Sequence, residues 1–330
     1  MADIKILNEK ELRQTLKLDG EVLNCIENAF KLLATNDVIM PPILSFPIPE
    51  HNGEVDVKTA YVPGINSFAI KMSPGFFNNP TLGLPSLNGL MVLFSATTGV
   101  VKGVLLDNGF LTDLRTAAAG AVAAKWLSRE ESHIAGIVGS GTQARLQLQA
   151  LTLVRDIRKA VIWGRDPNKA MGCAAECAKD LGIDVTAVDT VDYLMSVSDI
   201  VVSTTPSTSP LIFAHQLRAG QHITAMGADA DHKTELAADL IPCADHYVCD
   251  RLSQCLKQGE LRAAVAAGMI EADATFPELG DIIAGLETGR LASHDITVCD
   301  LTGTGVQDTA IATLAYQRAT VADTGTTFNN

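Results

Sequence analysis

The stretch HIAGIVGSGTQARLQL, residues 133–148, decides the fold of this chain. A short apolar run predicts a buried strand, a turn with two glycines follows it, and the residues after the turn have the spacing of an amphipathic helix. Gly139 permits the tight turn between strand and helix, and Gly141 lets the backbone approach a bound group. Ala144 is small enough for the helix to pack closely against the strand. The pattern predicts a strand–turn–helix unit of the kind that binds a dinucleotide.

The start of the predicted helix supplies an anion site. Its first backbone N–H groups have no partners within the helix, and the positive end of the helix dipole lies beside them. Together they favour the pyrophosphate of a dinucleotide. The alternative is a glycine-rich turn without a ligand, but the strand–helix pattern that follows favours a binding site. The predicted cofactor-binding residues of this turn are Gly139, Ser140, Gly141, Thr142, Gln143 and Ala144.

Short apolar runs alternate with helical segments from residue 134 onward, as in parallel βαβ units. The predicted strands are HIAGIVG, KAVIWG, IDVTAV, DIVVSTT, HITAMG, HYVCD and ITVCDL, in that order. They are apolar on both faces, so the sheet is expected to be covered on both sides. Residues 126–305 are therefore predicted to form an α/β domain of the Rossmann type, with a doubly wound parallel sheet.

The first 125 residues have a different pattern. An amphipathic helix is predicted at Asp19–Ala34 and a proline-rich turn at Met40–Pro49. Four extended runs at hairpin spacing follow, and a helical stretch, Leu111–Leu127, leads into the second domain. We expect an α+β domain over residues 1–125 that is completed by the helical segment within residues 306–330.

The composition is that of a folded, acidic protein. Of 330 residues, 47% are hydrophobic and 19% are charged, and the formal net charge is −13. This length allows two domains with a large buried core. Lysines and arginines are scattered, so no basic face is expected that would bind nucleic acid. No apolar stretch reaches the roughly 18 to 20 residues that span a bilayer, so no membrane association is expected.

The seven cysteines include no CxxC pair. Their odd number argues against a disulfide framework, and their spacing argues against a common zinc site. Cys173 and Cys177 lie four residues apart on a predicted helix, where they could share a metal or, as we expect, pack as small buried side chains. The cysteine pattern predicts a cytoplasmic protein without a bound metal.

The end of the second predicted strand, KAVIWGRDP, bears on the choice between NADH and NADPH. An NAD site usually has an acidic residue here that binds the ribose hydroxyls, but this chain has Gly164 followed by Arg165. Arg165 could pair with the 2′-phosphate of NADPH. The alternative is that Asp166 binds the ribose and that Arg165 is a solvated surface residue. We predict an NAD(P)H cofactor, with NADPH favoured over NADH.

Three charged residues interrupt segments that otherwise have the pattern of apolar core. They are Lys71 in SFAIKMSPGF, Arg115 in LTDLRTAAAGAVAA and Asp229 in ITAMGADADHKTEL. Lys71 could direct its ammonium group at a substrate carboxylate or amino group. Arg115 could hold a carboxylate or a cofactor phosphate with its bidentate guanidinium. Asp229 follows a predicted parallel strand, at the edge where open α/β sheets bind ligands.

Each of these three residues also has an ordinary structural interpretation. Lys71 could lie at a sheet edge with its ammonium group in solvent. Arg115 could form a structural ion pair, and Asp229 could cap a helix that begins near Lys233.

Several longer motifs occur in a fixed order. They are KMSPGF, GLPSLNGLMVL, GVLLDNGFLTDLRTAAAGAVAAKWL, GSGTQA, STTPS, MGADADHKTEL and TGTGVQD. In this order they resemble the ornithine cyclodeaminase/μ-crystallin family, from about Met40 to Asp308. The resemblance implies that the N-terminal domain and the C-terminal helix bind the substrate and form a homodimer.

The resemblance also implies roles for individual residues. Lys71 and Arg115 match the substrate-binding lysine and arginine of the family, and Asp229 matches its catalytic acid/base. Thr302 is expected to contact the substrate. The remaining matched positions are expected to line the cofactor, and they are Ser86, Thr205, Met226, Gly227, Ala228 and Leu301.

One position departs from the pattern of the family. Many members have Met-Pro-x-Arg in the first domain, where the arginine helps to hold the substrate carboxylate, whereas MPPILSF has Ile43 at that place. Losing this cation removes about 1.5 to 3 kcal/mol of charge-assisted hydrogen bonding, which argues against ornithine as the substrate. The stretch IPEHNGEVDVKTAYVPG resembles the branch associated with ectoine or β-hydroxyaspartate utilisation, and this implies an iminosuccinate-like substrate.

The expected function is that of an NAD(P)H-dependent imine reductase or amino-acid dehydrogenase, which exchanges a hydride with the α-carbon of a small amino or imino acid. In this interpretation Lys71 and Arg115 orient the substrate and Asp229 moves the proton. One alternative is a cyclodeaminating lyase, in which the nicotinamide is reduced and reoxidised within one turnover. Another is a protein without enzymatic activity that binds the cofactor or a small ligand, as in the μ-crystallin branch.

Overall fold

The computed structural model describes residues 3–329, and contacts within the chain divide it into two compact units. Unit 1 contains the segments before residue 116 and after residue 303, and unit 2 contains residues 116–303. The divisions fall within helix α3 (Phe110–Leu127) and just before helix α10 (Gly305–Val321). The boundaries expected from the sequence, 125/126 and 305/306, lie later in the chain than both divisions.

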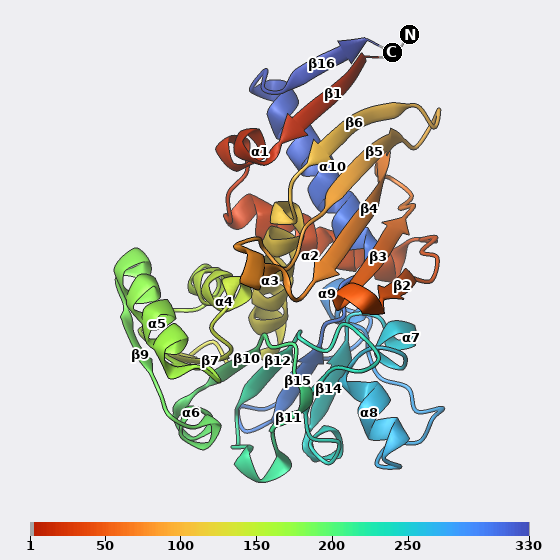
Figure 1. Cartoon of the computed structure of the whole chain (residues 1–330). Helices are drawn as coiled ribbons and strands as arrows, with labels where there is room; N and C mark the ends of the chain where they lie inside the picture. The colour runs from red at the N-terminus through yellow and green to blue at the C-terminus, as the bar shows by residue number, and fades with distance from the viewer. Residues whose placement is uncertain (1–2, 330) are drawn as a thin grey trace. The chain divides into compact units, whose positions relative to one another are not determined.

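Among the described residues, unit 1 contains a seven-stranded sheet in the order β16-β1-β6-β5-β4-β3-β2. Neighbouring strands are antiparallel except for the parallel pair of β1 and β6. Strands β1 and β16 come from opposite ends of the chain and lie side by side (Figure 1). The strands are β1 (Asp3–Asn8), β2 (Leu44–Ile48), β3 (Gly53–Ala60), β4 (Ser67–Phe76), β5 (Leu90–Ser95), β6 (Val101–Leu106) and β16 (Thr326–Asn329).

Helices cover one face of this sheet. Helix α10 packs on β3 and β4, α2 (Gly20–Thr35) packs against α10, and α1 (Glu9–Thr15) contacts both α10 and β1 (Figure 1). Helix α2 begins where it does because the Asp19 side chain accepts a hydrogen bond from the Val22 backbone N–H at 2.9 Å. This confirms the predicted helix at Asp19–Ala34. The buried face of α2 consists of Val22, Leu23, Ile26, Ala29, Phe30 and Leu33.

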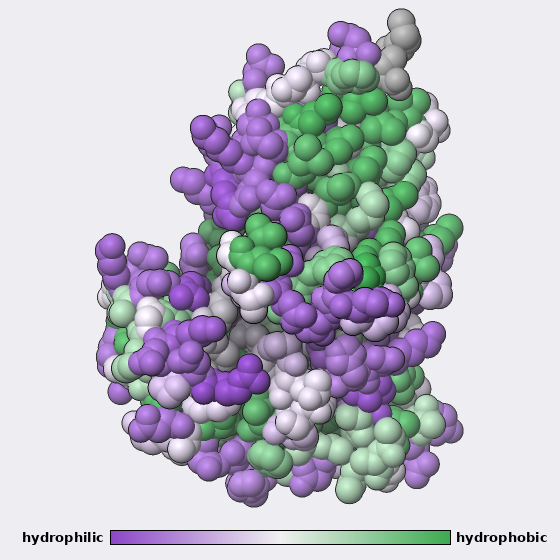
Figure 2. Space-filling view, viewed as in Figure 1, coloured by the Kyte–Doolittle hydropathy of each residue, from purple (hydrophilic) through white to green (hydrophobic). Residues whose placement is uncertain are grey.

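The two faces of the unit 1 sheet differ in character. On β4, Ala69 and Lys71 point toward α10, because the Ala69 N–H donates to Thr309 and the Lys71 ammonium pairs with Asp308. The residues that alternate with them along β4, among them Phe68, point to the opposite face, where Phe68 stacks on Phe94 of β5. Figure 2 shows a broad hydrophobic area over these strands on the face turned toward the viewer.

The predicted proline-rich turn at Met40–Pro49 is wrong over its second half. Residues Leu44–Ile48 form strand β2, which pairs antiparallel with β3. Pro47 lies within this strand although it has no N–H to donate. It is tolerated here because β2 is an edge strand with only one hydrogen-bonded neighbour.

Unit 2 contains a parallel sheet in the order β14-β15-β12-β10-β7-β8-β9. All of its strands correspond to apolar runs in the sequence, so the predicted Rossmann-type fold is confirmed. The strands are β7 (Ile134–Val138), β8 (Lys159–Trp163), β9 (Asp184–Ala187), β10 (Ile200–Ser203), β12 (His222–Ala225), β14 (His246–Cys249) and β15 (Thr297–Asp300).

The order of these strands locates the ligand-binding edge. The chain runs from β7 to β8 and β9 on one side, then returns to β10 on the other side of β7. Open α/β sheets bind ligands beyond the carboxyl ends of the strands at such a switch point. The helices that connect the strands are α4 (Thr142–Thr152), α5 (Pro167–Leu181), α6 (Val191–Val197), α7 (Leu252–Cys255), α8 (Glu260–Ala266) and α9 (Leu279–Ala284).

A second, two-stranded sheet in unit 2 was not predicted. Strands β11 (Thr208–Ile212) and β13 (Thr234–Leu236) pair in parallel. The alternative that Asp229 caps a helix beginning near Lys233 is therefore wrong, because Lys233 leads directly into a strand. Within residues 3–329, no helix is both long enough and apolar enough to cross a bilayer.

Candidate active site

The turn after β7 has the backbone that a glycine requires. Gly139 has φ +131°, and a Cβ at this position would lie 2.3 Å from Oγ1 of Thr204. Its N–H donates to the carbonyl of Trp163 at 2.8 Å, which ties the turn to the end of β8. A side chain at Gly139 would be strained at this φ and would collide with Thr204, which follows β10, so a glycine allows the tight turn.

The start of α4 is open to a ligand. Gly141 is the N-cap of α4. Because it has no side chain, it does not cap the first N–H groups of the helix. A Cβ on Gly141 would meet nothing within 4 Å, whereas Ala144 is fully buried against the core. The arrangement leaves backbone N–H groups and space together at a helix N-terminus, which fits the pyrophosphate of a dinucleotide.

Arg145 stabilises this turn and was not singled out in the sequence. Its guanidinium donates to the carbonyl oxygens of Ser140 and Gly141, each at 3.0 Å. Those carbonyls point toward Arg145, so the opposite side of the turn is left to the backbone N–H groups. Glu176 of α5 accepts a hydrogen bond from the same guanidinium at 2.5 Å and fixes its position.

Two charged residues, Arg165 and Asp166, follow β8 and have different roles in the structure. Oδ1 of Asp166 accepts hydrogen bonds from the N–H groups of Asn168 and Lys169, at 3.0 and 3.3 Å, and so caps α5. Arg165 is exposed. The carboxylate that could have bound a ribose is thus engaged in capping, and the guanidinium beside it faces solvent.

The segments after β10 and β12 are joined through Glu235. Oε1 of Glu235 accepts hydrogen bonds from the N–H and the hydroxyl of Thr205, at 2.6 and 2.7 Å. Oε2 accepts hydrogen bonds from the Ser203 hydroxyl at 2.7 Å and the Gly227 N–H at 2.8 Å. Burial raises the pKa of Glu235, and these four hydrogen bonds oppose that rise. Met226 and Ala228, on either side of Gly227, are buried.

Asp229 is held by a buried lysine. Its Oδ1 lies 2.7 Å from Nζ of Lys233, whose side chain is 8% exposed, while the Asp229 side chain is 47% exposed. The accessible carboxylate is therefore oriented by a cation beneath it. This is a suitable arrangement for a group that exchanges protons with a ligand.

The segment after β15 is fixed by a second buried carboxylate. Asp250 accepts hydrogen bonds from the N–H groups of Thr302 and Gly303, at 2.8 and 2.7 Å, and from the Thr302 hydroxyl at 2.9 Å. Leu301 is buried, and its N–H donates to the carbonyl of Ala225 at 2.9 Å. The Thr302 side chain therefore anchors the segment in this structure.

Unit 1 contains a buried charge cluster that joins Lys71 and Arg115. Nζ of Lys71 lies 3.1 Å from Oδ2 of Asp308, and Nε of Arg115 donates to Oδ1 at 3.0 Å. Arg115 also donates to the side chain of Gln307 at 3.2 Å. Lys71 is 2% exposed on an interior strand, so the interpretation of a solvated lysine at a sheet edge is wrong.

The protonation of this cluster follows from burial and charge. Burial lowers the pKa of Lys71 to about 7, Asp308 opposes this shift, and Arg115 and Lys58 add to it. Burial alone would raise the pKa of Asp308, but Lys71 and Arg115 lower it below its usual value. Lys58 lies directly opposite Lys71 in the β3–β4 register and is also buried. One carboxylate is thus surrounded by three cationic side chains, which favours binding of an anion.

Ser86 lies on the loop between β4 and β5. Its carbonyl accepts a hydrogen bond from the Phe76 N–H at 2.7 Å, and the residue is half-buried. This contact ties the loop to the end of β4.

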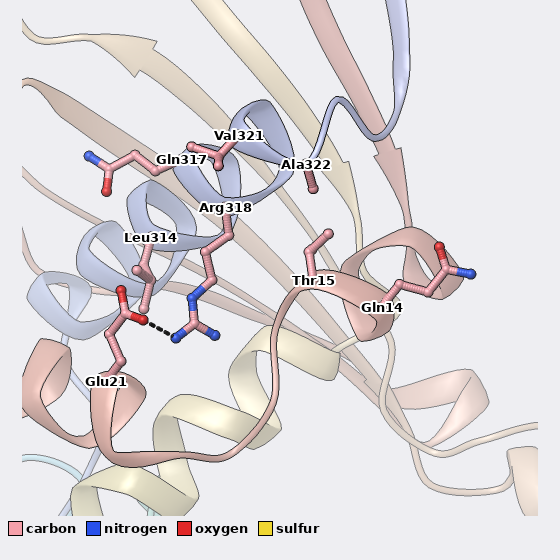
Figure 3. Close-up of a pocket in the computed structure, with 8 residues that line it drawn as sticks. All are labelled: Gln14, Thr15, Glu21, Leu314, Gln317, Arg318, Val321 and Ala322. Carbon is pink, nitrogen blue, oxygen red and sulfur yellow. Dashed lines mark hydrogen bonds and ion pairs between the residues drawn. The ribbon is translucent and has the colours of Figure 1, made fainter.

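A surface hollow between α1, α2 and α10 is unrelated to these residues. Figure 3 shows Thr15, Glu21 and Arg318 on its wall, and the guanidinium of Arg318 pairs with Glu21 and with Asp19. Because this cation is already neutralised by two carboxylates, the hollow lacks a charged group directed at a ligand. Within the described part of the chain, no cluster of three or more His, Cys, Asp or Glu side chains could hold a metal ion.

Several of these groups were missed in the sequence. Asp308 lies 193 residues from Arg115, and Glu235 lies 30 residues from Thr205, so neither pairing can be read from local spacing. Asp308 does carry one signal, since it is an acidic residue inside a helix whose neighbours are almost all buried. Glu235 has no comparable signal, because it follows a run of charged and polar residues.

Known proteins resemble the chain over its full length. A Sinorhizobium fredii protein named as an uncharacterized cyclodeaminase is 56% identical over 100% of both chains. The solved Δ1-pyrroline-2-carboxylate reductase of Thermococcus litoralis, in complex with NADH and L-proline, is 30% identical with a TM-score of 0.93, over 98% of this chain and 99% of that one. A solved archaeal alanine dehydrogenase dimer with bound NAD is 33% identical with a TM-score of 0.92, over 99% of each chain.

The family model gives the same assignment. It matches residues 3–323, which include both units and every charged residue of the candidate site. The solved relatives are oxidoreductases of amino or imino acids that bind NAD or NADH. The chain belongs to the ornithine cyclodeaminase/μ-crystallin family.

Proposed function

We propose that the chain is an NAD(P)H-dependent imine reductase or amino-acid dehydrogenase that acts on a small amino or imino acid. The observation that carries this proposal is the buried cluster in which Lys71 and Arg115 share Asp308. Two cations held rigidly by one carboxylate retain positive charge, and a substrate carboxylate can be bound by that charge. The solved relatives with proline and alanine chemistry support the same class of substrate.

The glycine turn after β7 would hold the pyrophosphate of the dinucleotide. Backbone N–H groups at the start of α4 would bind its phosphates. Thr205, Gly227 and Leu301 would line the part of the site that holds its nicotinamide half. When bound, the nicotinamide supplies a hydride to the substrate α-carbon or accepts one from it. The residues of this chain orient the substrate, exclude water and move the proton.

Asp229 is the proposed acid and base. Its carboxyl group gives a proton to the substrate nitrogen during reduction and takes one back during oxidation. Lys233 holds the carboxylate at 2.7 Å and leaves it 47% exposed, so the group is both positioned and accessible. Thr302 is proposed to contact the substrate.

We propose NADPH as the preferred dinucleotide. Arg165 is exposed at the position where a 2′-phosphate would be recognised, and Asp166 is engaged in capping α5. An iminosuccinate-like substrate is proposed because the stretch IPEHNGEVDVKTAYVPG resembles the branch associated with ectoine or β-hydroxyaspartate utilisation, and because Lys58 adds a further buried cation beside Lys71.

A cyclodeaminating lyase is the second candidate, because the 56% identical relative is named as a cyclodeaminase. In that case ammonia is released without net oxidation of the dinucleotide. The third is a binding protein without turnover. Mixing 2-oxo acids and ammonia with NADPH or NADH, and following the nicotinamide absorbance together with ammonia, separates all three.

Lys71→Met tests the substrate-binding cluster. It keeps the apolar stem but removes the charge, so kcat/KM for the amino or imino acid should fall at least about tenfold. Dinucleotide affinity should stay within about twofold of wild type. Lys5→Met is the matched control, because Lys5 lies in the same sheet, remote from Asp308 in the strand order, and its ammonium group donates to the carbonyl of Thr324 at 2.8 Å. Unchanged kinetics of Lys71→Met would remove this residue from the substrate site.

A homodimer in the cytoplasm is the proposed form of the protein. The uncovered face of the unit 1 sheet is apolar, with Phe68 and Phe94 stacked at 5.2 Å, and one solved relative is a dimer. A second copy packed on this face would bury it.

The free cysteines agree with a reducing compartment. Light scattering after gel filtration measures the mass, and Phe94→Glu should yield monomers.

A further inference from the structure

The Glu235 side chain joins two segments of unit 2, the one at the end of β10 and the one after β12. Its four hydrogen-bond donors come from Ser203 at the end of β10, from Thr205 two residues later, and from Gly227 after β12. All four distances lie between 2.6 and 2.8 Å. The Glu235 side chain is fully buried, so these contacts are shielded from water. The carboxyl group of Glu235 thus links the segment after β10 to the segment after β12.

The backbone at Gly227 is shaped around this carboxylate. A Cβ on Gly227 would lie 2.1 Å from the carbonyl oxygen of Thr205 and 2.5 Å from the carboxyl group of Glu235. The two segments therefore approach each other more closely than any side chain permits. Without the carboxylate between them, the donors of Thr205 and Gly227 would face each other with no acceptor.

The position of Glu235 is fixed from behind. Strand β13, which carries Glu235, pairs with β11, and Glu260 accepts hydrogen bonds from the N–H groups of Glu235 and Leu236 at 2.8 and 3.1 Å. The backbone of Glu235 is thus held in place, and its carboxylate is directed at the segments after β10 and β12. Asp229 lies two residues beyond Gly227, so the same contact anchors the segment that bears the proposed acid and base.

We infer that Glu235 is a positioning residue whose carboxylate holds the segments after β10 and β12 in the geometry that binds the nicotinamide half of the dinucleotide. This inference rests on the proposed dinucleotide-dependent function. The N–H groups of the glycine turn after β7, which are proposed to bind the pyrophosphate, are not among the donors to Glu235. Loss of the carboxylate therefore affects the second half of the binding site and leaves the first half intact.

Glu235→Gln is a stringent substitution because the amide has nearly the same shape. A carboxylate accepts at both oxygens, whereas the glutamine NH2 group donates and opposes the donors on one side. The dissociation constant for NADPH, measured by nicotinamide fluorescence, should rise at least about tenfold, the equivalent of one lost buried hydrogen bond. The dissociation constant for 2′-phospho-ADP-ribose, which lacks the nicotinamide ring, should change by less than about twofold.

Asp199→Asn is the matched control. Asp199 lies before β10, at the opposite edge of the same sheet, and its Oδ2 accepts the N–H groups of His133 and Ile134 at 2.9 and 3.0 Å. It should lower thermal stability as Glu235→Gln does but leave the NADPH dissociation constant unchanged. Equal weakening in both variants would mean that Glu235 acts only through general stability, and the inference would be wrong.

Hydrogen exchange without cofactor tests the same contact independently of activity. In Glu235→Gln, exchange of the peptide N–H groups at Thr205 and Gly227 should accelerate at least about tenfold, while the rest of unit 2 stays protected. Unchanged exchange there would refute the positioning role even if wild type binds no dinucleotide. Failure of wild type to bind NADPH or NADH, with accelerated local exchange, would overturn the proposed function while the contact itself stands.

Discussion

The two edges of the parallel sheet in unit 2 are held by different sets of charged side chains, carboxylates at the carboxyl edge and both arginines and carboxylates at the amino edge. At the carboxyl edge, Glu235 and Asp250 accept hydrogen bonds from N–H and hydroxyl groups of the segments after β10, β12 and β15. At the amino edge, Arg290 donates to the carbonyls of Leu127 and Gln221, at 2.7 and 3.1 Å. Arg155 similarly donates to carbonyls at the end of α3.

The pKa values of buried carboxyl groups also differ between the two edges. Near the carboxyl edge, burial raises the pKa of Asp300 to about 7 and that of Glu260 to about 8. At the amino edge, backbone hydrogen bonds, chiefly from Ala292, hold the pKa of Asp295 at about 2, so it stays ionised. Arginines keep their charge throughout the usual pH range. Two buried carboxyl groups near the carboxyl edge therefore change charge near neutrality, whereas Asp295 at the amino edge does not.

Asp229→Asn gives the largest expected effect and tests the functional edge directly. Turnover should fall by about 10² to 10⁴, because a positioned acid and base is lost, while the NADPH dissociation constant stays nearly unchanged. Steady-state rates and a fluorescence titration on the same preparation measure both. Near-normal turnover would exclude Asp229 from the mechanism and leave the carboxyl edge with a structural role alone.

Arg290→Met tests the structural edge. Several carbonyls lose their donor, so the free energy of unfolding of unit 2 should fall by about 2 to 4 kcal/mol. Both tryptophans of the chain, Trp126 and Trp163, lie in unit 2, so their fluorescence during urea unfolding reports on this unit. Values of kcat/KM for the folded protein should stay within about twofold. A large kinetic loss at unchanged stability would contradict the division between the edges.

Arg165→Asp sharpens the comparison at the end of β8. It removes a phosphate partner and adds a ribose acceptor, so the ratio of kcat/KM for NADPH over NADH should fall about 10- to 100-fold. Arg158→Asp is a suitable control, because Arg158 is exposed just before the same strand, at its amino end. A wild type that already strongly favours NADH would show that the interpretation of Arg165 is wrong.

The difference between the edges also predicts that stability depends on pH. Asp300 and Glu260 have pKa values raised above those of the unfolded chain, so their contribution is complete below about pH 4 and is lost as pH rises through about 7 and 8. The melting temperature reported by tryptophan fluorescence should therefore fall between pH 5.5 and pH 9, an interval of roughly 3.5 units chosen to span both titrations. Glu260→Gln should flatten this decline. An increase in stability over the same interval would contradict the assignment.

The sequence predicted unit 2 well because its parallel strands are buried on both faces. Each such strand is a continuous apolar run, and β7 with its glycine turn has few alternative interpretations. Strands β1, β2 and β16 of unit 1 were missed, because all three are short and because β2 and β16 are exposed strands at the edges of their sheet.

The candidate site was predictable only in part, for a similar reason. Lys71 and Arg115 stand out as cations within apolar segments, but their shared partner Asp308 is contributed by a helix far along the chain. Glu235 gave no local signal, since its role depends on two segments that meet only in the folded sheet. A single sequence thus identifies charged residues in apolar surroundings and cannot identify the groups that neutralise or position them.

The origin of Asp308 on α10 has a consequence for protein synthesis. Lys71, Arg115 and the neighbouring Lys58 emerge from the ribosome long before residue 308, so their only described shared carboxylate is absent during most of translation. Burying three cations without it would be costly. Unit 1 can therefore close only after unit 2 has been made, and ribosomes stalled before residue 308 should carry a folded unit 2 beside an open, protease-sensitive unit 1.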